Sequence, residues 1–344
     1  LAPASRYGLF AKSPLTGIFG ESYAGGHVAP QIKATGYDAV LLQGAADQPV
    51  YLEITDRGVT FHDATPFWGL DTYQAEEALE AATGVRGAKS IVIGPAGEKQ
   101  IPFALVGNDR GRQAGRTGMG AVMGAKRVKG IVFHGEATCP LYDAEAVKTY
   151  DRELRERGKT DAGAKAYRSY GTPMLVAMNN AVGAFPGYYW STGTVPHWKK
   201  ISAEALVDRF KPRSKACYRC FLACGKVTTV PDGRHAGLQV EGPEYETIFA
   251  FGGLCGVDDL AEILYLNDIC DRLGLDTITA GNVAAFAIEA SRRGALDLRL
   301  KYGDVDGIAG LIGQIARREG PGELLAQGVR AASRELGLEE LAIH

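Results

Sequence analysis

The sequence predicts an α+β protein in which a β-rich N-terminal domain, residues 1–136, is followed by a mainly α-helical domain, residues 137–344. Up to about residue 136, short apolar runs alternate with glycine and turn residues, which is the pattern of strands. Beyond that point, apolar residues recur at helical spacing between capping residues. A length of 344 residues is compatible with such a division into two domains.

The first domain is predicted to contain short strands and few helices. The expected strands are the apolar runs Ala39–Leu42, Val50–Ile54, Ile91–Ile93, Phe103–Val106 and Ile131–Phe133. One helical pattern, Asp71–Ala82, interrupts them. Near the N-terminus, Gly25-Gly26 precedes an amphipathic stretch. This pattern is typical of an ordinary turn, or of a loop that leads into a helix N-terminus suited to an anion.

The second domain is predicted to be a series of helices with recognisable start and stop signals. The expected helices are Asp143–Arg157, Thr172–Val182, Asp258–Leu273, Asp276–Arg293, Gly307–Arg318 and Glu323–Leu336. Because Gly274 stops one helix just before Asp276 starts the next, Asp271–Thr277 is predicted to be a helix–turn–helix joint. One expectation is that an acidic side chain there accepts a hydrogen bond from a ring N–H of a ligand. The alternative for Asp276 is that it caps the next helix.

The composition excludes several classes of protein. The 38 Lys and Arg residues balance 40 Asp and Glu residues, so a nucleic-acid partner, which requires a strongly basic face, is not expected. No apolar run approaches the roughly 18 residues of a membrane span. The chain starts without Met and without a basic-then-apolar signal segment. Three of the six cysteines fall within eight positions, which indicates metal or redox chemistry and predicts a cytoplasmic location.

The strongest motif is the run Cys217-x2-Cys220-x3-Cys224. Thiolates at this spacing are suited to one iron–sulfur cluster, with a fourth ligand from elsewhere. Part of a zinc site is an alternative, although zinc usually takes a second pair of similar spacing. Three structural cysteines are the other alternative. The remaining cysteines are isolated from one another: Cys139, Cys255 and Cys270.

A second motif is the glycine- and arginine-rich segment Asn108–Lys126. Its glycines let backbone amides approach a phosphate and its arginines add positive charge. The spacing matches neither the dinucleotide-binding fingerprint nor a Walker loop. The residues alone therefore leave two interpretations, anion binding and tight helix packing.

A third motif places Glu244 and Glu246 on either side of Tyr245. Two carboxylates this close repel each other, which is expected to raise the pKa of one of them toward the range useful for proton transfer. The alternative is a solvated acidic turn. In an extended segment the two side chains share a face, whereas in a helix they diverge.

Together these segments resemble the aldehyde ferredoxin oxidoreductase family, tungsten or molybdenum enzymes with a bis-molybdopterin cofactor. The resemblance covers essentially the whole chain. The segments that carry it are Arg6-Tyr7, Lys12–Gly17, Ala24–Gly26, Gly36–Ala39, Ile93–Gly97, Asn108–Lys126, the cysteine run, Gly242–Thr247 and Asp271–Thr277.

The resemblance implies a role for each motif. The residues that match positions around the pterin phosphates are Arg6, Tyr23, Ala24, Gly25, Gly26, Arg116, Thr117 and Gly118. In the family, carbonyls at the Tyr23 and Thr117 positions bind an Mg²⁺ ion that joins the two phosphates; position 23 is usually asparagine there. The residues that match a pterin-ring motif are Asp271, Gly274, Leu275 and Asp276.

The resemblance also implies the redox and proton-transfer groups. Cys217, Cys220 and Cys224 match three ligands of a [4Fe-4S] cluster beside one pterin. A glutamate of the 244–246 segment lies near the metal in the family, and its position favours Glu246 over Glu244 as the proton-transfer residue.

The activity that the resemblance implies is oxidation of an aldehyde to a carboxylic acid, with ferredoxin or another electron-transfer protein as acceptor and a homodimer as a candidate assembly. Family members are longer at both ends, so the sequence is expected to be a fragment that is inactive alone and lacks a C-terminal domain with the fourth cluster ligand. One alternative is the active-site subunit of a benzoyl-coenzyme-A-reducing complex. Another is a non-catalytic binding protein stabilised by zinc or a cluster.

Overall fold

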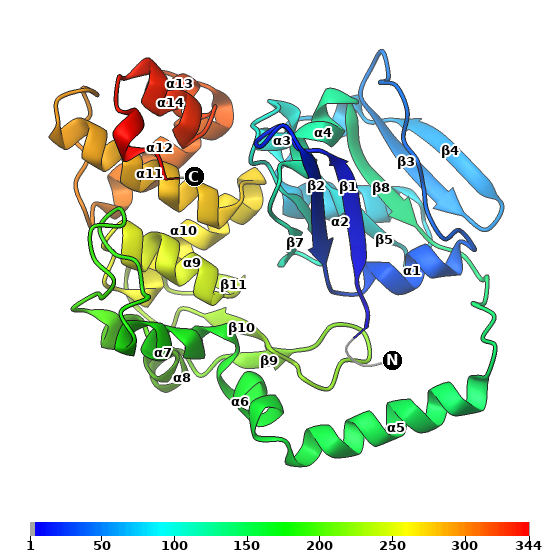
Figure 1. Cartoon of the computed structure of the whole chain (residues 1–344). Coiled ribbons are helices and arrows are strands. Elements are labelled where there is room, and N and C mark those ends of the chain that lie inside the picture. The colour runs from blue at the N-terminus through cyan, green and yellow to red at the C-terminus, as the bar shows by residue number, and fades with distance from the viewer. Residues whose placement is uncertain (1–3, 344) are drawn as a thin grey trace. The chain divides into compact units, whose positions relative to one another are not determined.

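The structure, a computed structural model, describes residues 4–343 and divides into two compact units. The first unit comprises Leu1–Lys165, Ala216–Ala223 and Arg272–Gly274. The second comprises Ala166–Lys215, Cys224–Asp271 and Leu275–His344. The predicted α+β class is confirmed, because most strands lie in the first unit and most long helices in the second (Figure 1). The units are discontinuous in sequence, since the loop that carries Cys217 and Cys220 belongs to the first.

The first unit is built around one mixed sheet and a hairpin. Its strands are β1 (Tyr7–Lys12), β2 (Phe19–Ala24), β3 (Val50–Thr55), β4 (Gly58–Asp63), β5 (Lys89–Val92), β6 (Val106–Asn108), β7 (Arg112–Ala114) and β8 (Val128–Phe133). Its helices are α1 (Val28–Ala34), a 3₁₀ turn (Thr65–Phe67), α2 (Thr72–Ala82), α3 (Pro95–Glu98), α4 (Met119–Ala125) and α5 (Ala144–Thr160). Helix α6 (Ala162–Tyr170) follows at the boundary.

Six of these strands form a sheet in the order β4-β3-β8-β5-β6-β7, while β1 and β2 form an antiparallel hairpin. Within the sheet only β3 and β8 are parallel. All residues of β8 are buried, as expected for a central strand. Helix α2 begins at a capping box between Asp71 and Gln74, and its Leu79 packs directly on Gly130 of β8.

The hairpin packs one face on the unit's core. Strand β2 alternates exposed and buried residues, and Tyr7 of β1 and Ala24 of β2 join the same apolar cluster as Leu52 and Ile131 of the sheet. Figure 1 shows the hairpin, in dark blue, in front of the sheet. The open end of the hairpin, where Tyr7 pairs with Ala24, therefore belongs to the core. Several predicted site residues lie at this end.

One strand prediction in this unit is wrong and another is wrong in part. Ala39–Leu42 forms no strand: its backbone has no ladder partner, and Leu41 is 80% exposed. In the run Phe103–Val106 the strand begins only at Val106. The backbone groups of Ala104 and Leu105 form hydrogen bonds with residues outside the sheet. The Leu105 N–H donates to the Gly274 carbonyl, and the Gly120 N–H donates to the Ala104 carbonyl.

The second unit is helical with a small sheet. Its helices are α7 (Leu175–Ala181), α8 (Ala203–Phe210), α9 (Tyr245–Thr247), a π-helix (Ile248–Leu254), α10 (Leu260–Leu273), α11 (Thr277–Arg292), α12 (Val305–Arg317), α13 (Pro321–Leu325) and α14 (Val329–Glu335). Single 3₁₀ turns are Thr172–Met174, Trp198–Ile201, Gly233–His235 and Glu339–Leu341. The strands β9 (Arg213–Lys215), β10 (Gly225–Thr229) and β11 (Gln239–Glu241) pair antiparallel in the order β11-β10-β9.

The predicted joint between α10 and α11 is confirmed. Gly274 has φ +79° between the two helices, and the Asp276 carboxylate caps α11. The predicted helix Glu323–Leu336 is instead two helices, because Gly328, at φ +86°, interrupts it. In the part of the chain that the structure describes, no helix is both long enough and apolar enough to cross a membrane.

Candidate functional site

The hairpin brings Arg6 beside the turn Tyr23–Gly26. Tyr7 is paired with Ala24 in the β1–β2 register, so the residue before β1 lies opposite the residues that follow β2. The Ser5 hydroxyl donates to the Gly26 carbonyl at 3.3 Å, which ties the N-terminal segment to the turn. Arg6 and Tyr23 are exposed, whereas Ala24, Gly25 and Gly26 are buried.

The loop Arg116–Gly118 lies against the same hairpin. The Thr117 hydroxyl is 3.4 Å from the Glu21 carbonyl of β2. Thr117 and Gly118 both have positive φ, +69° and +76°, so the backbone turns sharply before α4. The structure thus places this predicted phosphate-binding loop beside β2, the strand that contains Tyr23. Phosphate binding itself stays a prediction.

Much of the glycine content of the segment Asn108–Lys126 is explained by packing. A Cβ atom at Gly120 would lie 2.2 Å from the Leu105 carbonyl oxygen, and one at Gly124 would lie 1.8 Å from the Gly97 carbonyl oxygen. Helix α4 can therefore approach its neighbours only with glycine at these positions. Tight helix packing, one of the two sequence interpretations, is confirmed for Gly120 and Gly124.

A buried polar network holds the turn Gly25-Gly26. The Asn108 amide donates to the Gly25 carbonyl at 3.1 Å and accepts from the Tyr7 hydroxyl at 2.9 Å. The Asp109 carboxylate accepts the His27 backbone N–H at 2.6 Å. Because Asn108 and the Asp109 side chain are 1% and 7% exposed, water competes little for these bonds. Sequence reasoning did not single out Asn108 and Asp109, although they open the glycine-rich segment.

The first cysteine of the run packs on this turn. A Cβ atom at Gly25 would lie 2.6 Å from the Cys217 Sγ atom, so only glycine fits there. The Tyr218 N–H donates to the Gly26 carbonyl at 3.0 Å. Residues far apart in the sequence, in two different predicted motifs, therefore meet within the first unit.

The cysteine run forms a loop between β9 and β10. The three thiols are half-buried and form no disulfide between the described residues, and the Cys220 N–H donates to the Cys217 carbonyl at 3.0 Å to form a turn. Arg219 and Ala223 have positive φ, which lets the loop wind tightly.

Between residues 4 and 343, no three His, Cys, Asp or Glu side chains come together around a point that would hold a single metal ion. A four-iron cluster, in contrast, takes one thiolate per iron, so its ligands do not converge on one ion. The half-buried thiols of the cysteine run, which form no disulfide between the described residues, are compatible with cluster ligation, and the ligation itself stays a prediction.

A titratable residue lies next to the network that holds the turn. Burial raises the pKa of Glu76 to about 7, and the negative charges of Glu80 and Asp109 act in the same direction. The Arg110 backbone N–H donates to the Glu76 carboxylate at 2.9 Å, which opposes the rise. Glu76 thus titrates near neutral pH directly beside the residues that anchor Gly25-Gly26.

We expect Glu76→Gln to flatten the pH dependence of stability. The folded-state pKa of about 7 exceeds the ordinary 4.5, so the folded protein retains a proton that the unfolded chain releases. The stabilisation is complete below pH 4.5 and is lost as the pH rises through 7. Between pH 5 and pH 8, Glu76→Gln should gain about 1–3 kcal/mol in unfolding free energy over the wild type, measured by urea denaturation.

The matched control is Glu77→Gln, which changes an exposed glutamate on the same helix, α2. It should follow the wild-type pH dependence. If Glu76→Gln also ran parallel to the wild type, the raised pKa of Glu76 would be wrong.

The two glutamates of the third motif have different surroundings. Glu244 precedes α9 with extended backbone, whereas Glu246 lies within the helix, so the two side chains diverge. The Glu244 carboxylate accepts a hydrogen bond from the Thr172 hydroxyl, and the same hydroxyl accepts the Tyr245 N–H at 2.9 Å. Glu246 is exposed. This geometry leaves Glu246 as the more accessible carboxylate, and the role of either residue stays a prediction.

At the joint between α10 and α11, the predicted ring-binding residues make contacts within the protein. The Asp276 carboxylate accepts the Ile278 and Thr279 N–H groups at 3.2 and 3.1 Å, so the capping interpretation is confirmed. Asp271 is buried and accepts from the Asn267 amide at 2.8 Å. Leu275 is fully buried. Pterin binding by Asp271, Gly274, Leu275 and Asp276 stays a prediction.

A buried lysine lies next to the last cysteine. Lys226, on β10, is 3% exposed, and its ammonium group donates to the Cys224 carbonyl at 3.2 Å. Burial lowers the pKa of Lys226, while nearby Cys224 and Glu244 act in the opposite direction. Sequence reasoning missed this residue because a single lysine in a strand carries no signal before its acceptors are known.

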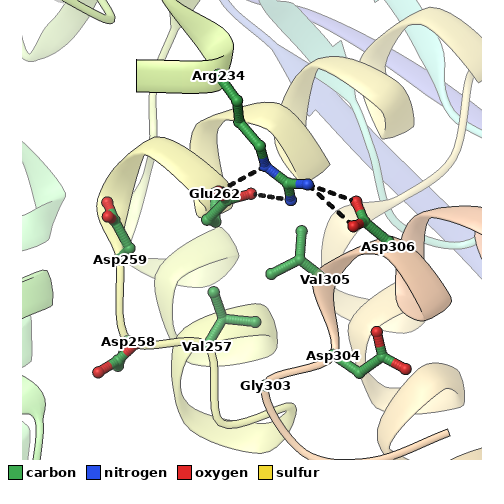
Figure 2. Close-up of a pocket in the computed structure, with 9 residues that line it drawn as sticks. All are labelled: Arg234, Val257, Asp258, Asp259, Glu262, Gly303, Asp304, Val305 and Asp306. Carbon is green, nitrogen blue, oxygen red and sulfur yellow. Dashed lines mark hydrogen bonds and ion pairs between the residues drawn. The ribbon is translucent and has the colours of Figure 1, made fainter. Parts of the chain in front are cut away.

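A pocket of about 320 Å³ lies within the second unit but contains none of the predicted site residues. Figure 2 shows Arg234 between Glu262 and Asp306, with ion-pair distances of 2.6 and 2.8 Å. The neighbouring Asp258 and Asp259 pair with Lys200 and Arg209. The acidic residues that line the pocket are Asp258, Asp259, Glu262, Asp304 and Asp306. Four of these five carboxylates are paired with Lys200, Arg209 or Arg234, and the Asp304 carboxylate accepts the Gly307 N–H, so the polar groups of this pocket serve the fold.

Comparison with known families places the chain among the oxidoreductases. Residues 1–135 match the model of the aldehyde ferredoxin oxidoreductase N-terminal domain, and residues 145–344 match the model of domains 2 and 3 of the same enzymes. The chain therefore belongs to the aldehyde ferredoxin oxidoreductase family.

Individual proteins show the same relationship. The chain is 37% identical over 346 residues to the tungsten-containing aldehyde ferredoxin oxidoreductase of Pyrococcus furiosus, covering 98% of this chain and 56% of that protein. It is 31% identical to the WOR-like subunit of an aliphatic sulfonate oxidoreductase from the same organism, covering 97% and 56% of the two chains. The chain thus spans about half the length of these relatives.

A solved structure has a similar fold. The active-site complex of benzoyl-coenzyme A reductase, solved with 1,5-dienoyl-CoA, aligns with a TM-score of 0.76 at 23% identity. The alignment covers 99% of this chain and 54% of that one. At this identity the likeness establishes the shared fold alone.

Proposed function

We propose that the protein encoded by the complete gene oxidises aldehydes to carboxylic acids and passes the electrons to ferredoxin. The observation that carries this proposal is the contact between the Gly25-Gly26 turn and Cys217. A pterin site and a cluster site must be adjacent for electrons to move between them, and this contact joins the two predicted motifs. The relatives named as tungsten-containing aldehyde ferredoxin oxidoreductases support the same substrate class.

The proposed cofactor set is a tungsten or molybdenum bis-molybdopterin, a [4Fe-4S] cluster and Mg²⁺. Arg6, Tyr23–Gly26 and Arg116–Gly118 would hold the pterin phosphates and the Mg²⁺ ion. Asp271 and the following joint would contact a pterin ring, and the three cysteines of the run would ligate the cluster. When bound, this set supplies a two-electron acceptor and a one-electron path out of the site.

The chain's own contribution is to bind, orient and move a proton. One aldehyde and one water give one carboxylic acid, two protons and two electrons, so two ferredoxins are reduced per turnover. Glu246 would accept a proton during attack of the water oxygen on the aldehyde carbon. The turn at Gly25-Gly26, held by Asn108 and Asp109, would keep the bound phosphates in a fixed position.

The test is anaerobic expression of the complete gene, followed by metal analysis and assay. We expect tungsten or molybdenum together with iron and labile sulfide, and aldehyde-dependent reduction of ferredoxin. Reduction of benzoyl-coenzyme A without aldehyde oxidation would replace this proposal by the reductase alternative, which the fold similarity also allows. Zinc alone would indicate a non-catalytic binding protein.

We expect Arg116→Ala to lower the pterin content of the purified protein. A charge-assisted contact to a phosphate contributes about 1.5–3 kcal/mol, so the affinity should fall by roughly 10- to 150-fold. Pterin and metal retained after dilution are the quantities to measure.

The matched control is Arg110→Ala, since the Arg110 guanidinium pairs with Glu77 at the surface at 2.8 Å. That variant should keep its pterin. Full pterin and metal in Arg116→Ala would instead show that Arg116 is a packing residue.

A further inference from the structure

Lys226 is surrounded by acceptors that belong to the loop and helix beside the cysteine run. Its Nζ atom lies 2.9 Å from the Arg168 carbonyl oxygen, 3.2 Å from the Cys224 carbonyl oxygen and 3.3 Å from the Ser214 hydroxyl. The Tyr167 carbonyl oxygen is a fourth acceptor, at 3.5 Å, so the three N–H donors of the ammonium group all have partners. The β9–β10 pairing, in which Lys226 lies opposite Ser214, fixes the start of the side chain.

The same acceptors connect the lysine to the third motif. A Cβ atom at Gly171 would lie 2.7 Å from the Cys224 carbonyl oxygen, so the backbone at residue 171 packs against Cys224. The next residue, Thr172, donates its hydroxyl hydrogen to the Glu244 carboxylate. The carbonyl that Lys226 holds is therefore enclosed between the lysine and the segment that binds Glu244.

From these contacts we infer that Lys226 is a positioning residue for Cys224, and that its ammonium group supplies a buried positive charge to an iron–sulfur cluster bound through that cysteine. The inference rests on the proposed function, since it requires the cluster. A cluster becomes more negative when it accepts an electron, so a nearby buried cation stabilises the reduced state and raises the reduction potential. Lys226 is 3% exposed, so little water screens its charge and its effect on the reduction potential is stronger.

The experiment compares Lys226→Met, Lys226→Gln and Lys226→Arg in the protein expressed anaerobically from the complete gene. Iron and labile sulfide report loading, and a redox titration followed by electron paramagnetic resonance reports the midpoint potential. In the two uncharged variants we expect a more negative potential. At the wild-type midpoint the reduced-to-oxidised ratio should fall about tenfold, which corresponds to 59 mV for one electron.

The controls separate charge from fold. Lys226→Arg keeps the charge and should stay near the wild-type potential, as should Lys200→Met, which removes an exposed lysine paired with Asp258. Loss of iron in both uncharged variants, with loading retained in Lys226→Arg, would also support the inference, because the charge would then be needed to hold Cys224.

Two results would overturn the inference. One is an unshifted potential in a loaded, uncharged variant. The other is loss of iron in all three Lys226 variants, which would make the residue a packing element. A wild-type protein without iron would contradict the proposed function itself, a separate outcome that the metal analysis identifies first.

Discussion

Replacing Cys220 by Ser in the protein expressed from the complete gene should remove most of its iron, labile sulfide and brown visible absorbance. Each thiolate of the proposed cluster binds one iron, and a serine hydroxyl is a much poorer ligand for iron in such a cluster. Cys220 is half-buried in the turn that its N–H closes with the Cys217 carbonyl at 3.0 Å. The serine variant can keep this backbone bond, so the loss should reflect ligation rather than unfolding.

The matched control is Cys139→Ser, which changes an exposed free cysteine outside the run. Its iron and sulfide content should equal that of the wild type. Unchanged iron in Cys220→Ser would refute ligation by this residue and would favour structural cysteines.

The parts of the fold that follow from local signals were predictable. The capping box at Asp71 and the helix stop at Gly274 are encoded within a few neighbouring residues, and both helix boundaries are confirmed. Ala39–Leu42 shows the limit of such reasoning. Its apolar run has strand character, but a strand also needs a ladder partner, and the sequence does not say whether one exists.

The arrangement of the candidate site depends on long-range contacts that no single motif reveals. The sequence identifies the turn at Gly25 and the cysteine at position 217 as separate features, but their packing appears only in the folded first unit. Asn108, Asp109 and Lys226 were missed for a related reason. Their importance comes from the backbone groups that they bind, and these lie in other segments.

The packing also changes how the glycine-rich segment is understood. Gly120 and Gly124 are required because carbonyl oxygens of neighbouring segments leave no space for a Cβ atom. The predicted anion binding by this segment is therefore better tested at the loop Arg116–Gly118 than at Gly120 and Gly124. This distinction makes Arg116, and not the glycines of α4, the residue whose replacement tests the pterin site.

Glu246→Gln should lower aldehyde turnover by about 10²- to 10⁴-fold while tungsten or molybdenum and pterin stay bound, because a positioned base typically contributes that factor. Glutamine keeps the size of the side chain but cannot accept the proton. Glu246 is exposed in the first turn of α9, so the substitution removes a charge at the protein surface. Turnover, metal content and the pH–rate profile are the measurements.

Glu244→Gln is the matched control, two residues away and equal in chemistry. Its amide oxygen can still accept the Thr172 hydroxyl hydrogen, so the local structure should survive and turnover should fall much less than in Glu246→Gln. The reverse order of effects would assign proton transfer to Glu244, with Thr172 orienting the base. Near-normal turnover and an unshifted pH–rate profile in both variants would place the base outside this segment, because no other carboxylate then lies within residues 244–246.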